Sequence, residues 1–322
     1  MRDIPTIMTS QEILDKAFRR VKKVLATDLT GLDRARAEAT GRLSALSNTI
    51  TAVLNKYIRA FPSLDQMHPF ERELIDIVIS LDDLRHSLGA IDWARKTVEA
   101  IHKKEYALIR SAKTRGEIST ALNSSYGRIS SVLNKVSGEL DFLNTARDKL
   151  REMPGLNVNE PVVVIAGCPN VGKSQIVTGI SSGKPEIASY PFTTKGVSLG
   201  HLFIGYDRVQ IMDTPGLLDR ELEKRNKIEL QAIAALEHIA NLLVYVFDPT
   251  ETCGYSMNAQ NNLLGHIRST FIGIPIIEVS NKSDLGISGP GIQVSAMNNV
   301  GLDVLLSEIR KALKTPEISD IK

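Results

Sequence analysis

The segment from Gly167 to Ser174 carries the residue types that hold a nucleoside polyphosphate. It fits the pattern G-x-x-x-x-G-K-[ST] and stands between an apolar run and a predicted helix, which is the context that the pattern requires. Glycines let backbone amides wrap a phosphate at a helix N-terminus, and Lys173 adds a positive charge for the β- and γ-phosphates. The Ser174 hydroxyl is a ligand type that Mg²⁺ accepts. The segment therefore predicts a phosphate-binding loop, equally suited to an ATPase or a GTPase.

The predicted contacts of this loop with a nucleotide come from seven consecutive or nearly consecutive residues. They are Gly167, Asn170, Val171, Gly172, Lys173, Ser174 and Gln175.

A second motif, Asp213-Thr214-Pro215-Gly216, follows an apolar strand-like run. Its position at the end of a strand places Asp213 at the carboxyl edge of the sheet, where it faces the phosphate loop and can hold Mg²⁺ through water. Gly216 offers a backbone amide without a side chain in the way, which suits contact with a γ-phosphate. The motif therefore predicts a segment that senses whether that phosphate is present.

Between these motifs lies Tyr190-Pro191-Phe192-Thr193-Thr194, where one threonine should complete the magnesium shell. We favour Thr194, so the predicted metal ligands are Ser174, Thr194 and Asp213. The alternative interpretation is an ordinary polar loop with Phe192 in the core.

The third motif, Asn281-Lys282-Ser283-Asp284, distinguishes guanine from adenine. The Asp284 carboxylate can accept hydrogen bonds from N1 and N2 of guanine, whereas adenine would leave it desolvated and unpaired. The aliphatic stem of Lys282 can lie on the base. A backbone amide in Ser295-Ala296 can reach the guanine O6. The combination predicts GTP and GDP as ligands and argues against an ATPase.

Apolar strands alternate with helices in the part of the chain that carries these motifs. Strands are expected near 162–166, 198–204, 208–212, 242–247 and 275–280, and helices near 172–182, 227–240, 257–270 and 301–314. This alternation is typical of a mostly parallel sheet with helices on both faces. We therefore predict an α/β P-loop GTPase domain over residues 156–322.

The preceding residues, 1–155, are predicted to form an all-α helical bundle of four or five helices. Thr9 and Glu12 have the spacing of a capping box, and Pro62 and Pro69 interrupt the helical pattern. Further turns are expected at Gly31, Gly89 and Gly116. The apolar positions recur at helical spacing over one continuous face, at Leu74, Ile77, Val78, Leu81, Leu84 and Leu88. Trp93, the single tryptophan, is expected in the core or in a helix-packing interface.

Composition narrows the choice of protein class. The two cysteines, Cys168 and Cys253, are too few for a disulfide framework, and no apolar stretch reaches the roughly 18 residues of a membrane span. We expect a cytoplasmic protein with no membrane partner, and the lack of an amphipathic aromatic segment argues against a dynamin-like stalk. Net charge is +5 for residues 1–155 and −3 for the remainder. This asymmetry indicates a polyanionic partner for the first domain.

Residues 160–315 resemble the translation-factor-related GTPases of the Obg-like group, whose first switch is similar to Ala188-Ser189-Tyr190-Pro191-Phe192-Thr193-Thr194. The long helical domain before the G domain resembles the nucleolar GTP-binding protein branch, without the glycine-rich N-terminal domain of Obg itself. The chain looks like a short, archaeal-type version, without the C-terminal extension of eukaryotic members. This resemblance implies a partner in the large ribosomal subunit or its precursor, both its RNA and its proteins, and no DNA.

The position after Asp213-Thr214-Pro215-Gly216 is Leu217, where Ras-like GTPases have a glutamine that orients water. Intrinsic hydrolysis should therefore be slow unless something assists it. Asn170 stands where potassium-dependent GTPases supply a ligand for K⁺, so K⁺ or a partner should stimulate hydrolysis. The alternative for Asn170 is that it only suits the tight loop. The predicted catalytic residues are Lys173, Thr194, Gly216 and Asn170.

The site residues, together with what the resemblance implies, leave two functions open. The first is a GTP-hydrolysing switch that acts in large-subunit assembly. The second is a guanine-nucleotide sensor, or binding module, with little intrinsic hydrolysis.

Overall fold

The computed structural model describes residues 4–26, 29–152, 156–188, 196–219 and 225–314, which form two compact units. The first unit is Met1–Gln66 with Ile79–Arg151, and the second is Met67–Val78 with Glu152–Lys322. The predicted boundary after residue 155 lies close to the division at Arg151. Two consecutive domains do not, however, account for Met67–Val78, which is separated in sequence from the rest of the second unit.

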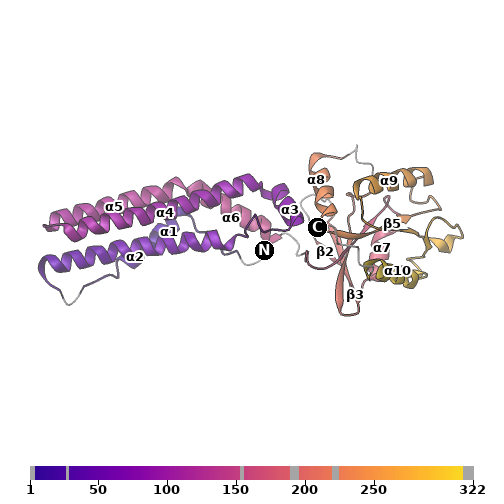
Figure 1. Cartoon of the computed structure of the whole chain (residues 1–322), viewed down its shortest axis with the longest axis horizontal. Helices are drawn as coiled ribbons and strands as arrows, with labels where there is room; N and C mark the ends of the chain where they lie inside the picture. The colour runs from indigo at the N-terminus through magenta and orange to yellow at the C-terminus, as the bar shows by residue number, and fades with distance from the viewer. Residues whose placement is uncertain (1–3, 27–28, 153–155, 189–195, 220–224, 315–322) are drawn as a thin grey trace, which may run out of the picture. The chain divides into compact units, whose positions relative to one another are not determined.

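The first unit is all helical. It consists of α1 (Ser10–Val21), α2 (Gly31–Ala60), α4 (Leu81–Ser111), α5 (Arg115–Lys135) and α6 (Ser137–Glu152), and Figure 1 shows α2, α4 and α5 running side by side. The predicted capping box is present, because the Glu12 amide donates to Thr9 Oγ1 at 3.3 Å and the Thr9 amide donates to Glu12 Oε2 at 2.8 Å. The predicted break at Pro62 and Pro69 also occurs.

Three expectations for this region are wrong. Gly89 lies inside α4 and makes no turn, whereas Gly31 and Gly116 lie in the first turns of α2 and α5. The apolar face that begins at Leu74 belongs to two helices, because Ser80 adopts a left-handed φ of 61° between α3 (Pro69–Ile79) and α4. The Ser80 hydroxyl then accepts from the Asp83 amide and starts α4. Trp93 is 48% exposed, so it lies on the surface rather than in the core.

The second unit contains a seven-stranded sheet in the order β2-β3-β4-β1-β5-β6-β7. Its strands are β1 (Val162–Ala166), β2 (Glu186–Ala188), β3 (Val197–Ile204), β4 (Asp207–Asp213), β5 (Ala240–Phe247), β6 (Ile276–Ser280) and β7 (Ile292–Gln293). The strands from β4 to β7 in this order are parallel, whereas β3 is antiparallel to both β2 and β4. The α/β class is confirmed, and β2 is an element that the sequence pattern did not predict.

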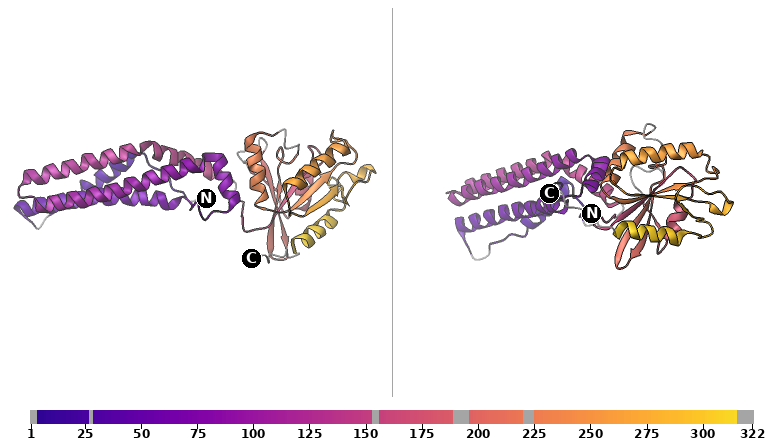
Figure 2. Two further views of the ribbon diagram at one scale, coloured as in Figure 1. Left: turned by 45° about the horizontal axis from the view of Figure 1, so that its top comes forward. Right: turned by 45° about the vertical axis from the view of Figure 1, so that its right-hand side comes forward.

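Helices cover both faces of this sheet, as Figure 2 shows. α7 (Lys173–Ile180) and α10 (Leu302–Lys314) pack together on one face, and a methyl group added at Gly179 would lie 2.5 Å from Leu302. α8 (Lys227–Glu237) and α9 (Met257–Thr270) lie on the other. Every residue of β1 is buried, as expected for a central parallel strand. Because β1, β4, β5 and β6 are parallel, their carboxyl ends meet at one edge of the sheet.

α3 joins the second unit at the end of α8. The His238 ring nitrogen Nε2 lies 3.2 Å from Glu73 Oε1.

Candidate functional site

The phosphate loop has a backbone that glycine alone can form at two positions. Gly167 and Gly172 have φ angles of 141° and 97°. A Cβ atom would lie 2.5 Å from the Val246 carbonyl at Gly167 and 2.2 Å from Asn281 Nδ2 at Gly172, so any larger residue would clash. Asn170, which is exposed, also has a left-handed φ of 62°. The loop therefore packs closely against the end of β5 and the Asn281 side chain.

α7 begins directly after this loop at Lys173, and its N-cap residue, Gly172, has no side chain that could cap the helix. The first amides of a helix need an acceptor, so this end can hold an anion. The Lys173 ammonium group donates to the carbonyl groups of Gly167 and Cys168, each at 2.8 Å, and the residue is 8% exposed. Burial lowers the pKa of Lys173, while the carboxylates of Asp213 and Asp219 oppose that change. The positive charge of Lys173 therefore lies against the loop backbone, beside a cavity that Lys173 helps to line.

A cavity of about 550 Å³ opens beside this charge. It is lined by Pro169, Asn170, Gly172, Lys173, Ser174, Gln175, Asp213, Pro215, Gly216 and Asp219. Its volume is within the range of sites that bind small molecules.

Two of the predicted magnesium ligands lie together in this cavity. Ser174 Oγ donates to Asp213 Oδ2 at 2.5 Å, and Asp213 is fully buried at the end of β4. Its other oxygen, Oδ1, is buried and has no hydrogen-bond partner in the described part of the chain. Burial raises the pKa of Asp213, although the Ser174 hydrogen bond and the Lys173 charge act in the opposite direction. A buried carboxylate oxygen without a partner beside a hydroxyl fits a divalent cation.

The third predicted ligand, Thr194, lies outside the described residues, as does the rest of the Tyr190–Thr194 motif. Within the described ranges, no three His, Cys, Asp or Glu side chains gather as a separate metal site.

The backbone amide of the predicted γ-phosphate sensor already has a hydrogen-bond acceptor within the protein. The Gly216 amide, at a residue with φ of 83°, donates to Asp219 Oδ2 at 2.8 Å. Leu217 is only 1% exposed, so its side chain is core material and does not face the cavity. Asp219 was not among the predicted site residues, although an acid three residues after a glycine at a strand end could have indicated it. The Asp219 carboxylate stands where an anion could accept from Gly216.

Asn281 connects the predicted base-reading motif to the predicted phosphate loop. Its Nδ2 donates to the Val171 carbonyl at 2.9 Å, and its Oδ1 accepts from the Ala296 amide at 3.0 Å. The Ser295 amide donates to the Val300 carbonyl at 2.9 Å. Both amides that the sequence suggested for guanine O6 are therefore engaged within the protein. A contact of either amide with O6 requires one of these hydrogen bonds to open or to be shared.

Asp284 and Ser295 form a second connection in this region. The Ser295 hydroxyl donates to Asp284 Oδ1 at 2.6 Å, while Asp284 itself is exposed. The serine, 1% exposed, fixes one carboxylate oxygen of the aspartate. A carboxylate held in this way can accept two parallel hydrogen bonds from a guanine edge.

Lys282 is anchored by a residue that the sequence motifs did not indicate. Its ammonium group lies 2.6 Å from Asp248 Oδ2 and donates to Thr252 Oγ1 at 2.7 Å. Asp248, fully buried at the end of β5, also accepts from the hydroxyls of Thr250 and Thr252 and from the Cys253 amide. Burial alone would raise the pKa of Asp248, but these hydrogen bonds outweigh it and lower the pKa to about 2.

Gln260 of α9 fixes the backbone around Asp248. Its Oε1 accepts from the Asp248 amide at 2.8 Å, and its Nε2 donates to the Asp248 carbonyl at 3.0 Å. Asp248 is therefore fixed through its backbone as well as through the hydrogen bonds of its carboxylate.

Comparison with known proteins matches both halves of the chain to one family. Residues 1–157 match the family model described as NOG1 N-terminal helical domain, and residues 227–284 match Nucleolar GTP-binding protein 1 (NOG1). An uncharacterized protein of Methanocaldococcus jannaschii is 37% identical over 88% of this chain and 81% of its own length. Nucleolar GTP-binding protein 1 of Kluyveromyces lactis is 29% identical over 88% of this chain.

The chain spans 45% of that yeast relative's length. A solved structure of the G domain of the T. maritima FeoB iron transporter is 21% identical, covers 48% of this chain and 99% of its own, and has a TM-score of 0.39. Among the described helices, none is long and apolar enough to cross a membrane.

Proposed function

Because the chain belongs to the nucleolar GTP-binding protein 1 family, whose members are named for GTP binding, we propose that it is a magnesium-dependent GTPase that acts as a switch in assembly of the large ribosomal subunit. The observation that carries the proposal is the position of Asn281. One side chain ties the phosphate loop to the loop of Ser295 and Ala296, so the charge-binding and base-reading parts form one continuous site.

In this proposal each part of the site has a separate role. The amides between Gly167 and Lys173 surround the β-phosphate, and Lys173 leaves the Gly167 and Cys168 carbonyls to contact the β- and γ-phosphates. Ser174, Asp213 and Thr194 would hold Mg²⁺, which supplies positive charge to the transferring phosphoryl group. Val171 and Gln175 contribute backbone contacts. Asp284 and Lys282 read and cover the guanine, and an amide of Ser295 or Ala296 must leave its present partner to reach O6.

We infer slow intrinsic hydrolysis from Leu217. A buried aliphatic side chain cannot orient the attacking water, so the reaction depends on an additional group. Asn170 is exposed at the cavity, and its carbonyl oxygen can contribute to a K⁺ site near the developing negative charge. A protein or RNA partner that supplies a cation would serve the same purpose.

The helical unit is proposed to contact ribosomal RNA, since it carries the excess of positive charge. The basic cluster of Arg19, Arg20, Lys22 and Lys23 is exposed at and after the end of α1, as such contacts require. We expect the protein to act in the cytoplasm on a ribosomal particle.

The second candidate function is a guanine-nucleotide sensor that hydrolyses little GTP, which the burial of Leu217 favours. Single-turnover hydrolysis separates the two functions. For a switch, the rate should rise at least about tenfold when purified large subunits are added, as activation by a supplied cation would allow. A slow rate that neither subunits nor K⁺ changes would support the sensor instead.

A further inference from the structure

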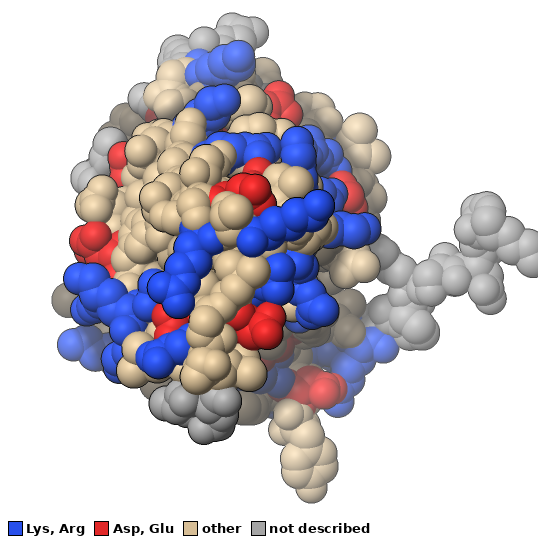
Figure 3. Space-filling model, turned by 90° about the vertical axis from the view of Figure 1, so that its left-hand side faces the viewer, with Lys and Arg blue, Asp and Glu red and all other residues tan. Residues whose placement is uncertain are grey.

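One end of the helical unit concentrates positive charge. At this end, which we call the bundle end, α2 and α5 begin and α4 finishes, covering residues 31–42 and 103–122. These two ranges hold eight Lys and Arg residues and four Asp and Glu residues, a net charge of +4. Figure 3 views the molecule from this side and shows Lys and Arg side chains gathered over much of the surface. Most of the positive balance of residues 1–155 therefore belongs to this end.

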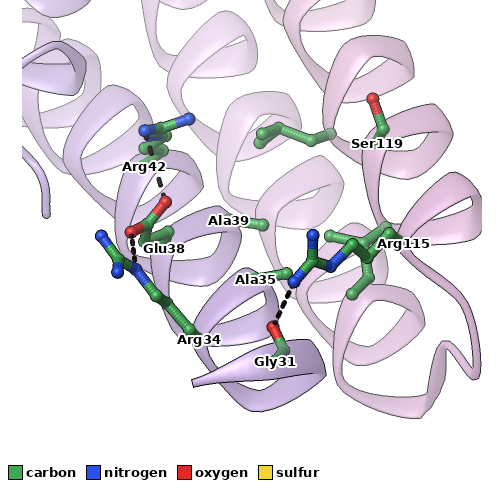
Figure 4. A pocket seen from close by; sticks show the side chains of 10 residues that line it. Gly31, Arg34, Ala35, Glu38, Ala39, Arg42, Arg115 and Ser119 are labelled. Atoms are coloured by element: carbon green, nitrogen blue, oxygen red, sulfur yellow. Dashed lines mark hydrogen bonds and ion pairs between the residues drawn. The ribbon is translucent and has the colours of Figure 1, made fainter. Parts of the chain in front are cut away.

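A cleft lies within the bundle end, between α2 and α5, with a volume of about 440 Å³ (Figure 4). Its lining consists of Gly31, Arg34, Ala35, Glu38, Ala39 and Arg42 from α2 and Arg115, Ile118, Ser119 and Leu122 from α5. The alanines, together with Ile118 and Leu122, give it an apolar floor. The three arginines stand at its rim.

Two of the three rim arginines contact a single carboxylate, that of Glu38. Glu38 Oε1 lies 2.9 Å from Arg34 Nε, and Oε2 lies 3.6 Å from an Arg42 guanidinium nitrogen. The hydrogen bond from Arg34 lowers the pKa of Glu38, which therefore remains ionised. Arg115, from the other helix, donates to the Gly31 carbonyl at 3.3 Å. Three guanidinium groups against one carboxylate leave the cleft with a net charge of +2.

The chemistry of the cleft selects the ligand. An apolar floor accepts a flat ring, and guanidinium groups both stack on such rings and bind phosphate through paired hydrogen bonds. A nucleoside phosphate satisfies both features, and a volume of 440 Å³ accommodates one. The surrounding positive surface continues beyond the cleft, which suits a chain of phosphates more than a free nucleotide.

We infer that the cleft between α2 and α5 binds one unpaired nucleotide of RNA, with its base against Ala35, Ala39 and Leu122 and its flanking phosphates on Arg34, Arg42 and Arg115. The inference rests on the proposed RNA partner and gives that partner a specific place of contact. It concerns a part of the chain that is separate from the guanine-nucleotide site.

The test measures binding of the full-length protein to a fluorescent single-stranded 12-nucleotide RNA of mixed sequence as salt is varied. The cleft variant is Arg34→Ala with Arg115→Ala. The control is Lys56→Ala with Arg59→Ala, which removes the same charge from exposed positions in the last turns of α2. We expect the cleft variant to bind about tenfold more weakly than the control. Its slope of log affinity against log salt should fall by about 1.4, for two lost phosphate contacts on a single strand.

A second variant tests the apolar floor without changing charge. Ala35→Leu puts a larger side chain into the cleft from a half-buried helical position, so it should weaken the single-stranded RNA about fivefold and leave a duplex of the same sequence unaffected. A thermal melt and GTP titration check that each variant is folded. Cross-linking of RNA containing 4-thiouridine should label peptides of α2 and α5.

Equal RNA affinities for the cleft variant and its control would overturn the proposal, as would unchanged binding by Ala35→Leu. If free uridine monophosphate, added at the same total phosphate concentration as the RNA, displaces the RNA probe, the cleft would be assigned to a free nucleotide instead. Subunit binding that weakens in the cleft variant while the RNA probe never binds would assign it to an acidic protein. Failure of the proposed switch has a different signature, namely RNA binding that is intact while subunit binding is independent of GTP.

Discussion

The ammonium group of Lys282 lies 2.6 Å from the carboxylate of Asp248, and this pair joins the end of β5 to the motif that we propose reads the base. The contact spans 34 positions of sequence and holds the lysine stem in one orientation. Asp248 is fully buried and also receives hydrogen bonds from Thr250, Thr252 and Cys253, so several contacts fix its position. We infer that Asp248 positions Lys282 for contact with guanine.

Asp248→Asn should weaken GDP binding about tenfold, equivalent to about 1.4 kcal/mol, because Lys282 loses its charged partner. It should also lower the free energy of unfolding by about 2 kcal/mol, as expected for hydrogen bonds to a charged group. Isothermal titration and urea unfolding measure these two effects. The conservative control is Thr250→Ser, which retains a hydroxyl for Asp248 and should change neither.

The same pair predicts a pH dependence. The pKa of Asp248 is lowered to about 2 in the folded protein, against about 4 for an ordinary aspartate. The stability that it contributes is therefore fully present above pH about 4 and is lost as the pH falls toward 2. The difference in unfolding free energy between wild type and Asp248→Asn should be constant from pH about 7 to about 5 and then shrink. A difference that grows on acidification would contradict this assignment.

Asp284→Asn should change the base preference from guanine to xanthine. The amide presents a donor where guanine also presents donors, whereas xanthine offers a carbonyl oxygen. Loss of two hydrogen bonds to a carboxylate should weaken GTP binding by about 3 kcal/mol, or roughly a hundredfold. Ser295→Ala, which removes the hydroxyl 2.6 Å from Asp284, should weaken it about tenfold without changing the preference. Competition of GTP, XTP and ATP against a fluorescent GDP measures the base preference of the wild type and of both variants. Equal competition by ATP and GTP in the wild type would rule out guanine specificity.

Asp219→Ala should favour GTP over GDP. The Asp219 carboxylate accepts the Gly216 amide that a γ-phosphate would need, and it places a negative charge in the same cavity. Its removal should raise affinity for a non-hydrolysable GTP analogue about tenfold relative to GDP, since one competing hydrogen bond and one repulsive charge disappear. Asp219→Asn, which keeps a side-chain acceptor without the charge, should give an intermediate value. Equal gains for both nucleotides would place the effect outside the γ-phosphate position.

Replacement of sodium by potassium should raise the hydrolysis rate. Two variants at Asn170 separate a cation ligand from a backbone role, because its φ of 62° is a conformation that glycine adopts without strain. Asn170→Gly retains the backbone but lacks the carbonyl oxygen, so it should lose the potassium gain while nucleotide affinity remains. Asn170→Asp keeps a side-chain oxygen at the same position and should retain part of the gain. A potassium effect that survives in Asn170→Gly would show that the residue only suits the loop.

Much of this architecture was predictable because it depends on local patterns. The apolar strands, the phosphate loop and the break between Pro62 and Pro69 each follow from neighbouring residues. The break at Ser80 was not predictable in this way, since a one-residue interruption left the spacing of the apolar positions intact. The helix composition around Trp93 gave no sign of which face meets the core.

The missing site residues depend on contacts that the motifs themselves do not contain, some local and some between distant segments. Asp248 shows its role only when β5 and β6 are adjacent in the sheet, which brings Lys282 to it. Asp219 depends on the turn after Gly216, and the use of the Ala296 amide by Asn281 depends on the approach of two loops. Motif spacing predicted a chemistry for the site but could not show which donors the protein itself occupies.

The measurement that tests the central claim most directly is co-sedimentation of the full-length protein with large ribosomal subunits in GDP or a non-hydrolysable GTP analogue. A switch that orders its sensor segments only around a γ-phosphate should bind subunits at least about tenfold more tightly with the analogue, a difference of about 1.4 kcal/mol. Asp284→Asn should lose this difference with guanine nucleotides and regain it with a xanthine analogue. Tight binding to subunits that is the same in GDP, in the analogue and without nucleotide would contradict the account.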